Sequence, residues 1–353
     1  MSKVPKKLQK DDYSEILNSL GLTKVHQGKV RDTWSLKSIT DKDALLFLAS
    51  DRVSIFDFVL NALVPKKGEV LTGLTHFWLT LVMPEFTNHL IPSDFDSDEN
   101  YINDLANEYG ELNDILSRGL IVENLQGKMW DFEMIFRHHI GGSVFKKYQE
   151  TGQAGGQQLP IGLPQWSKLE EPIFTPSTKE EIGHDINVDA AYFFKVMEER
   201  GIYDEAQLVV TQLADAYKKA YKYAAEKGVL ILDTKFEVAG LTLADEILTP
   251  DSSRFVKEDD WQEAMKKGQN PKFLDKQPIR DWGSIVETPF YKDGKQIIGI
   301  NNLKPENPAH VEFVHGLTVP DKVISDATDR YLKIFRLLTG FSLDNYQGRI
   351  MGI

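Results

Sequence analysis

Residues 229–238 combine two hydrophobic patterns. Residues 229–232 form a continuous apolar run, and strict alternation of polar and apolar positions follows it. This switch predicts a strand that passes from the core to a solvated edge. Since strand side chains repeat every second residue, Asp233, Lys235 and Glu237 are expected to project from one side of it. Three charged side chains then share one surface.

A second strand is expected to fold back beside the first. Gly240 supplies the freedom for a turn, so that residues 243–248 pair with the first strand and bring Asp245 toward Glu237. Two carboxylates would then be able to share a cation. The loop Thr-Pro-Asp-Ser-Ser-Arg, which ends at Arg254, adds hydroxyls and a guanidinium at the end of the strand. The alternative is a half-solvated hairpin whose outer face is merely charged.

Periodicity and turn residues predict helices and strands along the rest of the chain, and no internal repeat is visible. The clearest helix covers residues 204–227, where small and apolar residues share one face and Gly228 ends the helix. The other expected elements are a short helix at 13–20, a strand meander at 23–50, a helix at 70–83 ended by Pro84, an exposed acidic loop and helix at 93–113, strands at 120–124 and 129–137, an irregular flap at 151–165, a hairpin at 291–300 and a closing helix at 320–338.

The composition indicates a soluble globular protein. The chain has 353 residues, which exceeds a typical single domain and favours two coupled lobes. Hydrophobic residues make up 41% and no long apolar run is present, so no membrane span is expected. The first residues lack the apolar segment of a secretory signal and cysteine is absent, so a cytoplasmic location is expected. The formal net charge of −12 argues against a nucleic-acid partner, which normally requires a basic stripe.

Gly28 interrupts the predicted strand meander near the N-terminus. A glycine between strands lets the backbone approach a ligand closely, and Lys29 and Arg31 fall on one face of the strand that follows. In a nucleotide enzyme this arrangement holds phosphates, whereas the alternative is an ordinary hairpin turn with a solvated basic edge. His138 and His139 are adjacent on a predicted strand and face opposite ways, so we do not expect them to share a metal ion.

Several segments together resemble one enzyme family. The sequences Asp-Thr-Lys-Phe-Glu at 233–237 and Ala-Asp-Glu-Ile-Leu-Thr-Pro-Asp-Ser-Ser-Arg-Phe at 244–255 resemble SAICAR synthetase, the phosphoribosylaminoimidazole-succinocarboxamide synthase of purine biosynthesis. Each motif alone is a weak signal, whereas the ordered set is specific. The resemblance continues at 28–32, 50–57, 67–72, 172–179 and 275–282, and so covers most of the chain from Gly28 to Trp282.

The resemblance implies an α+β fold of the SAICAR synthetase-like type, related to ATP-grasp enzymes, with lobes at 1–128 and 129–353 and a nucleotide cleft between them. The family's reaction joins L-aspartate to the carboxylate of carboxyaminoimidazole ribonucleotide (CAIR). It uses ATP and Mg²⁺, proceeds through an acyl phosphate and gives SAICAR, ADP and phosphate. One alternative is a small-molecule kinase with a similar ATP cleft, and another is a nucleotide-binding regulatory module without catalysis. Whether the protein is a monomer or a homodimer stays open.

The resemblance also implies a nucleotide and metal site. Glu237 and Asp245 are expected to hold Mg²⁺. Since ATP and both substrates are anions and the chain is acidic, the site must be a local positive island. The residues expected around the nucleotide are Gly28, Lys29 and Arg31 at the phosphates, Met129 and Asp131 in the hinge whose backbone reads adenine, and Glu133 close by.

A second group is expected to bind CAIR and its reacting carboxylate. Asp233 and Lys235 are the candidate catalytic residues of this group. His184 and Asp185, in a stretch that is shorter than in relatives, are expected beside the site. The residues expected to bind the ribonucleotide are Arg137, Ser143, Asp233, Lys235 and Arg254.

Overall fold

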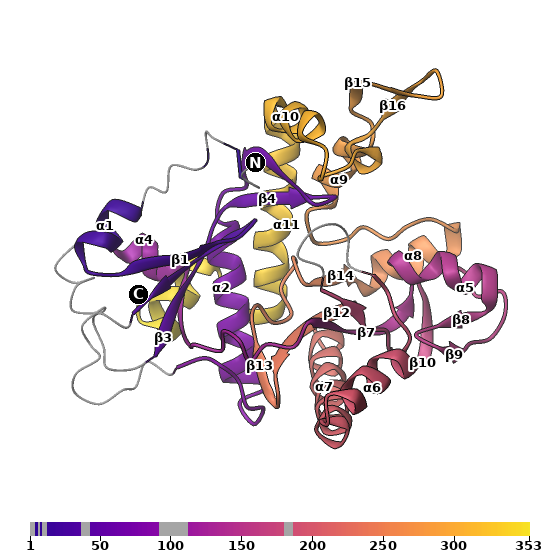
Figure 1. Ribbon diagram of the computed structural model, residues 1–353, viewed down its shortest axis with the longest axis horizontal. Helices are drawn as coiled ribbons and strands as arrows, with labels where there is room; N and C mark the ends of the chain where they lie inside the picture. The colour runs from indigo at the N-terminus through magenta and orange to yellow at the C-terminus, as the bar shows by residue number, and fades with distance from the viewer. Residues whose placement is uncertain (1–3, 6–7, 9–12, 37–42, 92–111, 180–185) are drawn as a thin grey trace.

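The structure is a computed structural model that describes residues 4–5, 8, 13–36, 43–91, 112–179 and 186–353. Within these ranges, two larger antiparallel sheets have helices packed around them (Figure 1). Helices and antiparallel strands that follow one another in this way make an α+β fold, as expected. None of the described helices is both long enough and apolar enough to span a membrane.

The first sheet comes from the N-terminal part of the chain. It has the antiparallel order β1 (Thr23–Gln27), β2 (Arg31–Ser35), β3 (Ala44–Ala49) and β6 (Gly119–Glu123). Trp34 and Leu46 pack there with Leu17 of α1 (Ser14–Ser19) and with α4 (Leu112–Ser117). The expected short helix, meander and strand at 120–124 are confirmed, whereas most of the expected acidic segment at 93–113 lies outside the described residues. A separate hairpin follows β3, formed by β4 (Arg52–Ile55) and β5 (Phe58–Leu63).

The second sheet is built around the strand expected at 229–238. This strand is β12 (Val229–Ala239), and β13 (Thr242–Ala244) folds back on it with Ala244 opposite Glu237. The strand expected from residue 129 begins later, because a turn with Gly127 in the left-handed conformation (φ 78°) comes before it. The other strands of this sheet are β7 (Phe132–Ile140) and β14 (Ser253–Lys257) on either side of β12, and β10 (Ser167–Phe174) and β11 (Ser177–Thr178) beside β7.

Helices α6 (Ala190–Glu199) and α7 (Tyr203–Ala225) lie together along the second sheet (Figure 1). The helix expected at 204–227 is thus confirmed. Its small buried residues let it approach β12 closely, and the hydroxyl of Tyr217 donates to the carbonyl of Ile231 at 2.7 Å. The flap expected to be irregular at 151–165 contains a short hairpin. The remaining elements of this half are α5 (Phe145–Thr151), β8 (Gln153–Ala154), β9 (Gln157–Gln158) and α8 (Glu258–Lys267).

The C-terminal segment returns to the N-terminal half of the molecule. Its last long helix, α11 (Asp321–Thr339), packs against α2 (Lys67–Phe77), as Figure 1 shows. The contact is so close that a Cβ atom at Gly73 would lie 2.8 Å from the ring of Phe335. The expected hairpin at 291–300 and closing helix are confirmed. The other elements are α9 (Gln277–Ser284), β15 (Glu287–Lys292), β16 (Lys295–Ile298), α10 (Pro308–Gly316) and α12 (Leu343–Tyr346).

Helix α2 corresponds to the helix expected at 70–83. It begins earlier, at Lys67, and its last part widens into a π-helical turn at Trp78–Val82 before Pro84 ends it. A single hydrophobic cluster joins the two halves through this helix. Trp78 packs in the same cluster as Phe236 of β12 and Phe335 of α11.

Residues 87–90 connect the two sheets by main-chain pairing. Asn88 bridges to Leu243 of β13, and Leu90 bridges to Val122 of β6. Between them, the amide of His89 donates to the carbonyl of Leu243 at 3.0 Å, and its carbonyl accepts from the amide of Glu123 at 2.8 Å. The two sheets are therefore held in register at this point.

Candidate active site

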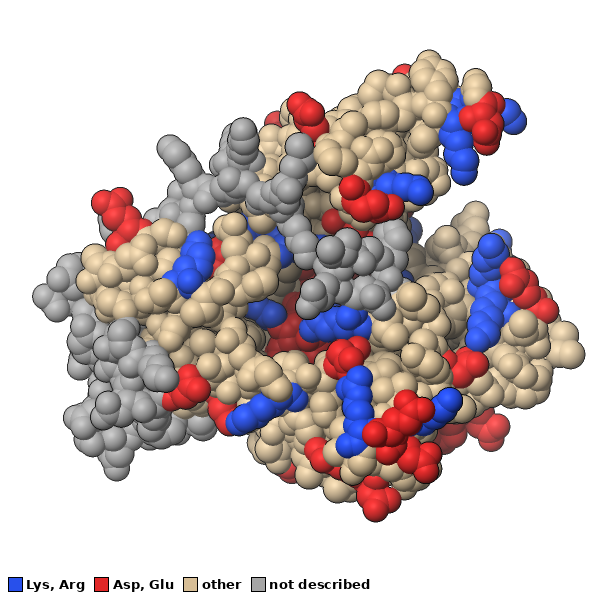
Figure 2. Space-filling view, in the orientation of Figure 1, with Lys and Arg blue, Asp and Glu red and all other residues tan. Residues whose placement is uncertain are grey.

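A cleft lies where the tip of β12 faces β2 and β3. Two adjoining cavities of about 300 and 310 Å³ form it. Figure 2 shows Lys, Arg, Asp and Glu side chains gathered in the hollow between the two halves of this face. We call the two cavities together the interlobe cleft. Their shared walls contain Arg31, Phe47, Lys179, Glu237 and Asp245.

The two cavities differ in chemistry. The first, which we call the apolar compartment after Leu45, Leu125 and Met129, also has the polar residues Glu123 and Gln126 in its wall. The second, the charged compartment, adds Lys29, Lys235 and Glu246 to the shared residues. An apolar chamber that opens into a charged one suits a ligand with a flat ring at one end and an ionic tail at the other.

Glu237 and Asp245 both line the two cavities of the cleft, because β13 returns beside β12. Glu237 is 7% exposed. Lys179 contacts the Glu237 carboxylate, and the Nζ atom of Lys235 lies 3.8 Å from it. Arg31 contacts the Asp245 carboxylate. Burial alone would raise the pKa of Glu237, but Lys235 and Lys179 outweigh it and hold the pKa below its ordinary value. Two carboxylates suit Mg²⁺, which takes its other ligands from phosphate and water. Among the described residues, no cluster of three or more acidic, His or Cys side chains offers an all-protein metal site.

Lys235 lies between two carboxylates of the cleft wall. Its Nζ atom is 2.6 Å from Glu133, whose other oxygen accepts a hydrogen bond from Ser177 at 3.1 Å. Burial acts to lower the pKa of Lys235, but Glu133 and Glu237 raise it above its ordinary value. The ammonium therefore stays charged, which fits electrostatic stabilisation of a developing negative charge rather than proton abstraction.

The register of the second sheet places one carboxylate between two guanidinium groups. Asp233 of β12 stands opposite Arg137 on β7 and opposite Arg254 on β14. Both arginines lie 2.5 Å from the same Asp233 oxygen. Arg137 also donates to Thr175 at 2.9 Å and to Ser143 at 3.5 Å. We call Arg137, Asp233 and Arg254 the arginine pair site, because two cations share one anion and retain one positive charge for a ligand.

Gly28 forms the tight turn between β1 and β2. Its amide donates to the carbonyl of Arg31 at 2.7 Å, and a Cβ atom at Gly28 would lie 2.8 Å from that oxygen. Arg52 holds the loop from behind, since it donates to the carbonyls of Gly28 and Lys29 at 3.3 Å and pairs with Asp32 at 2.5 Å. Lys29 itself points toward the charged compartment and lies 2.7 Å from Asp57.

The two residues expected in the adenine hinge separate in the structure. Met129 lines the apolar compartment. Asp131 lies on the surface, where Arg200 binds both its oxygens at 2.6 and 2.8 Å. This hydrogen-bonded guanidinium lowers the pKa of Asp131. The structure thus places Met129 in the wall of the cleft and the Asp131 side chain away from the cleft. His184 and Asp185, which were expected beside the site, are not among the described residues.

A buried charged cluster is formed around Asp251, in the loop before β14. The carboxylate of Asp251 is 2.8 Å from Nζ of Lys67 and 3.5 Å from Nζ of Lys276, and the hydroxyl of Tyr331 donates to it at 2.5 Å. These contacts join α2, the start of α9 and α11 to the loop before β14. No sequence signal indicated that Lys67 and Asp251 are partners, because they are far apart in the chain.

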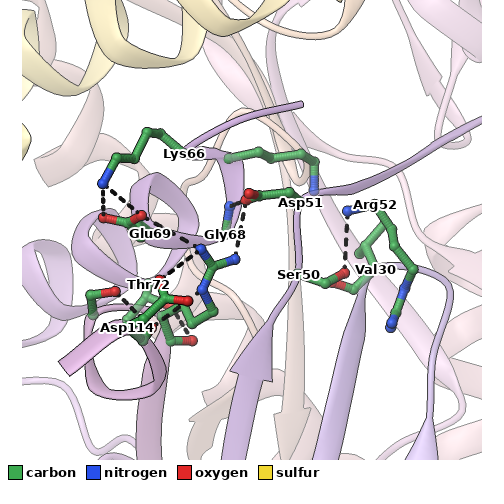
Figure 3. Close-up of polar contacts among 12 residues, drawn as sticks. Val30, Ser50, Asp51, Arg52, Lys66, Gly68, Glu69, Thr72 and Asp114 are labelled. Atoms are coloured by element: carbon green, nitrogen blue, oxygen red, sulfur yellow. Dashed lines mark hydrogen bonds and ion pairs between the residues drawn. The ribbon is translucent and has the colours of Figure 1, made fainter. Parts of the chain in front are cut away.

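Asp51 and Glu69 hold the start of α2, as Figure 3 shows. The amide of Gly68 donates to Asp51 at 2.9 Å, and Lys66 lies 2.9 Å from Glu69. Arg118 reaches both carboxylates, at 3.3 and 3.5 Å. A carboxylate at the N-terminus of a helix satisfies free amides and complements the helix dipole. The 50–57 motif therefore has a structural part in positioning α2.

These features define a class of protein. An α+β fold with a cleft that joins an apolar compartment, a row of cations and paired carboxylates is typical of an enzyme that uses a metal-bound nucleotide. Residues 24–297 match the model of the SAICAR synthetase family. The chain belongs to this family.

Individual relatives match along most of their length. The chain is 39% identical over 327 residues to the phosphoribosylaminoimidazole-succinocarboxamide synthase of Mannheimia succiniciproducens, covering 91% of this chain and 99% of that protein. The solved SAICAR synthase of Saccharomyces cerevisiae, complexed with SAICAR, is 30% identical with a TM-score of 0.70, and the match covers 91% of this chain and 96% of that one. A SAICAR synthetase solved in complex with ADP has a TM-score of 0.56 at 20% identity over 90% of this chain and 98% of that one, and so shares the fold.

Proposed function

We propose that this protein is an ATP-dependent ligase of purine biosynthesis that joins L-aspartate to the carboxylate of CAIR, giving SAICAR, ADP and phosphate. The observation that carries the proposal is the arrangement along β12. Glu237 and Lys235 face the interlobe cleft, and Asp233 stands in the arginine pair site, so one strand links a nucleotide cleft to an anion site. Membership of the SAICAR synthetase family supports the same reaction.

ATP is proposed to occupy the interlobe cleft. The adenine ring suits the apolar compartment beside Met129, and the phosphates suit the charged compartment beside Lys29 and Arg31. Glu237 and Asp245 would hold Mg²⁺, which when bound neutralises charge on the phosphates. The likeness to a SAICAR synthetase solved with ADP supports the fold of such a cleft.

CAIR is proposed to bind at the arginine pair site. Arg137 and Arg254 offer directed, charge-assisted hydrogen bonds to an anion, and Ser143 adds a hydroxyl within reach of Arg137. Arg254 has a side chain that is 29% exposed, so it can meet a ligand, whereas the Arg137 side chain is 4% exposed and supports it. The ribonucleotide would then extend along β12 toward Lys235.

The reaction requires an activated carboxylate, because oxide is a very poor leaving group. A carboxylate oxygen of CAIR attacks the γ-phosphorus of ATP, and ADP leaves with the electrons of the broken P–O bond. The aspartate amine then attacks the acyl carbon, phosphate leaves, and the amine releases a proton as the amide forms. Lys235 stabilises the negative charge that develops on the oxygens during both steps.

We also propose the class of substrate, the cellular location and the division into lobes. The substrates are small molecules, the location is the cytoplasm, and the lobes divide at residues 1–128 and 129–353, with α11 of the second lobe packed against α2 of the first. The first lobe then supplies the Gly28–Arg31 loop, and the second supplies β12 with its metal and substrate residues.

The test is a coupled assay of purified protein with Mg²⁺, ATP and CAIR, with and without L-aspartate. We expect one ADP for each amide formed, and glutamate should substitute poorly because its extra methylene moves the reacting groups out of register. ADP release at equal rates without any amino acid would instead identify a kinase with a similar cleft.

A further inference from the structure

His89 lies at the main-chain bridge between the two sheets. Its amide donates to Leu243 and its carbonyl accepts from Glu123, so the backbone is fixed from both sides. The side chain is 2% exposed and lines the apolar compartment of the interlobe cleft. Its ring stands edge-on to Phe47, with 5.6 Å between ring centroids and an interplanar angle of 70°. The imidazole is thus held in one place in the cleft wall.

The Nε2 atom of His89 is buried and has no hydrogen-bond partner among the residues that the structure describes. Two other buried histidines have hydrogen-bond partners: His139 has Trp166 and Tyr221 as partners at 3.2 Å, and His310 accepts from the amide of Lys304 at 2.9 Å. Leaving a buried polar atom unpaired is costly, so an unpaired atom on a side chain that lines a cavity points to a ligand that pairs with it.

The charge state of His89 narrows the kind of ligand. Burial, with a smaller effect from the nearby Arg31, lowers the pKa of His89 to about 3. The ring is therefore neutral at physiological pH and offers a hydrogen bond without a charge. A neutral imidazole suits an uncharged polar group better than a phosphate, for which Lys29 and Arg31 are the nearby cations.

We propose that Nε2 of His89 hydrogen-bonds to the nucleoside part of ATP and is a specificity residue for the nucleotide. The inference rests on the proposed function, in which ATP occupies this cleft. His89 lines the apolar compartment and is absent from the walls of the charged compartment, whereas Arg31 lines both. His89 therefore reaches the half of the ligand that carries the base and the ribose, next to its junction with the phosphates.

The first experiment measures binding of Mg·ATP and of Mg·tripolyphosphate by calorimetry to the wild type and His89→Leu. Tripolyphosphate carries the phosphates without a nucleoside. We expect ATP affinity to fall about 10-fold, the size of one lost hydrogen bond, and tripolyphosphate affinity to stay unchanged. The melting temperature of the ligand-free variant should not fall, because leucine removes an unpaired polar atom from the core.

Two further variants test the position of the hydrogen bond. Nε2 of histidine and the terminal amide nitrogen of glutamine are both three bonds from Cβ, whereas the asparagine amide is two bonds away. His89→Gln should therefore keep most of the ATP affinity and His89→Asn should lose it. This pair decides the question even if His89→Leu does not fold.

The matched control is His138→Leu. Both ring nitrogens of His138 are also shielded from water, but His138 does not line the described cavities of the interlobe cleft. Its ATP affinity should equal that of the wild type. Equal ATP affinity of wild type and His89→Leu, or an equal loss for ATP and tripolyphosphate, overturns the role of His89 alone. A wild type that binds no ATP overturns the proposed function as well.

Discussion

Replacing Asp251 by asparagine is expected to destabilise the folded protein strongly. The Asp251 side chain is 4% exposed and faces Lys67 at 2.8 Å and Lys276 at 3.5 Å, with Tyr331 as a hydrogen-bond donor at 2.5 Å. Asparagine keeps the size of the side chain and an oxygen for Tyr331, but it removes the negative charge. Lys67 is fully buried, so its ammonium cannot turn to water.

The magnitude follows from the burial of this cluster. Removing one partner of a buried ion pair costs about 3–5 kcal/mol, because an uncompensated charge remains. At Asp251 two ammonium groups lose the same carboxylate. Burial already lowers the pKa of Lys276, so this lysine can release its proton and relieve part of the repulsion. We therefore expect a loss of about 4 kcal/mol of unfolding free energy, a large share of the roughly 5–15 kcal/mol of a typical protein.

Urea unfolding at neutral pH measures this loss. The double variant Lys67→Met, Asp251→Asn should lose less unfolding free energy than the two single variants lose together. In the double variant the Lys67 ammonium, which Asp251→Asn leaves without its carboxylate, is absent. The control is Asp326→Asn, which breaks an exposed pair with Lys322 of 2.7 Å and should leave the midpoint unchanged. Strict additivity, or a loss at Asp251 no larger than at Asp326, would refute the reasoning.

The same cluster predicts a pH dependence. Burial acts to raise the pKa of Asp251, but Lys276 and Lys67 outweigh it and hold the pKa well below its ordinary value. A carboxylate with a depressed folded-state pKa contributes stability above its unfolded-state pKa and loses it as the pH falls toward the folded-state pKa. The difference in stability between the wild type and Asp251→Asn should therefore shrink in acid.

Three further predictions concern the reaction itself. Glu237→Gln and Asp245→Asn should each raise the Mg²⁺ concentration for half-maximal rate while circular dichroism stays native, because an amide lacks the charge that a hard cation prefers; a Mg²⁺ titration that superimposes on the wild type would contradict the metal role. Lys235→Met should lower kcat by about 10²-fold without much change in the Mg²⁺ requirement, which the same titration measures. Arg254→Ala should weaken CAIR binding far more than ATP binding, as measured by calorimetry, and Arg254→Lys should restore part of the CAIR affinity. Equal losses of CAIR and ATP affinity would contradict a role of Arg254 in binding CAIR.

Local periodicity was enough to predict β12 and α7. The alternation after residue 232 put Asp233, Lys235 and Glu237 on one side of a strand, and Gly240 indicated the turn that brings Asp245 back. These signals can be recognised in the sequence because the helix period and the strand period each span only a few consecutive residues.

The partners of those residues depend on distant segments and were not readable in the same way. Arg137 and Arg254 flank Asp233 because β7 and β14 pair with β12 in one particular register. His89 carried no local signal, since its place in the cleft follows from pairing of residues 87–90 with two sheets. The resemblance placed Asp131 in the adenine hinge, but Arg200 at the C-terminal end of α6 holds the Asp131 side chain at the surface.

The close contact of α11 with α2 also constrains how the protein is made. Helix α2, with a face shaped at Gly73 to accept Phe335, leaves the ribosome long before Phe335 is synthesised. Until then the side of α2 that packs against α11 is not covered by it, and long-range contacts of this kind slow folding. We therefore expect nascent chains that stop before Asp321 to be protease-sensitive and to recruit chaperones. The wall of the charged compartment that α2 supplies, at Thr72 and Thr75, should then reach its final position only after α11 has been synthesised.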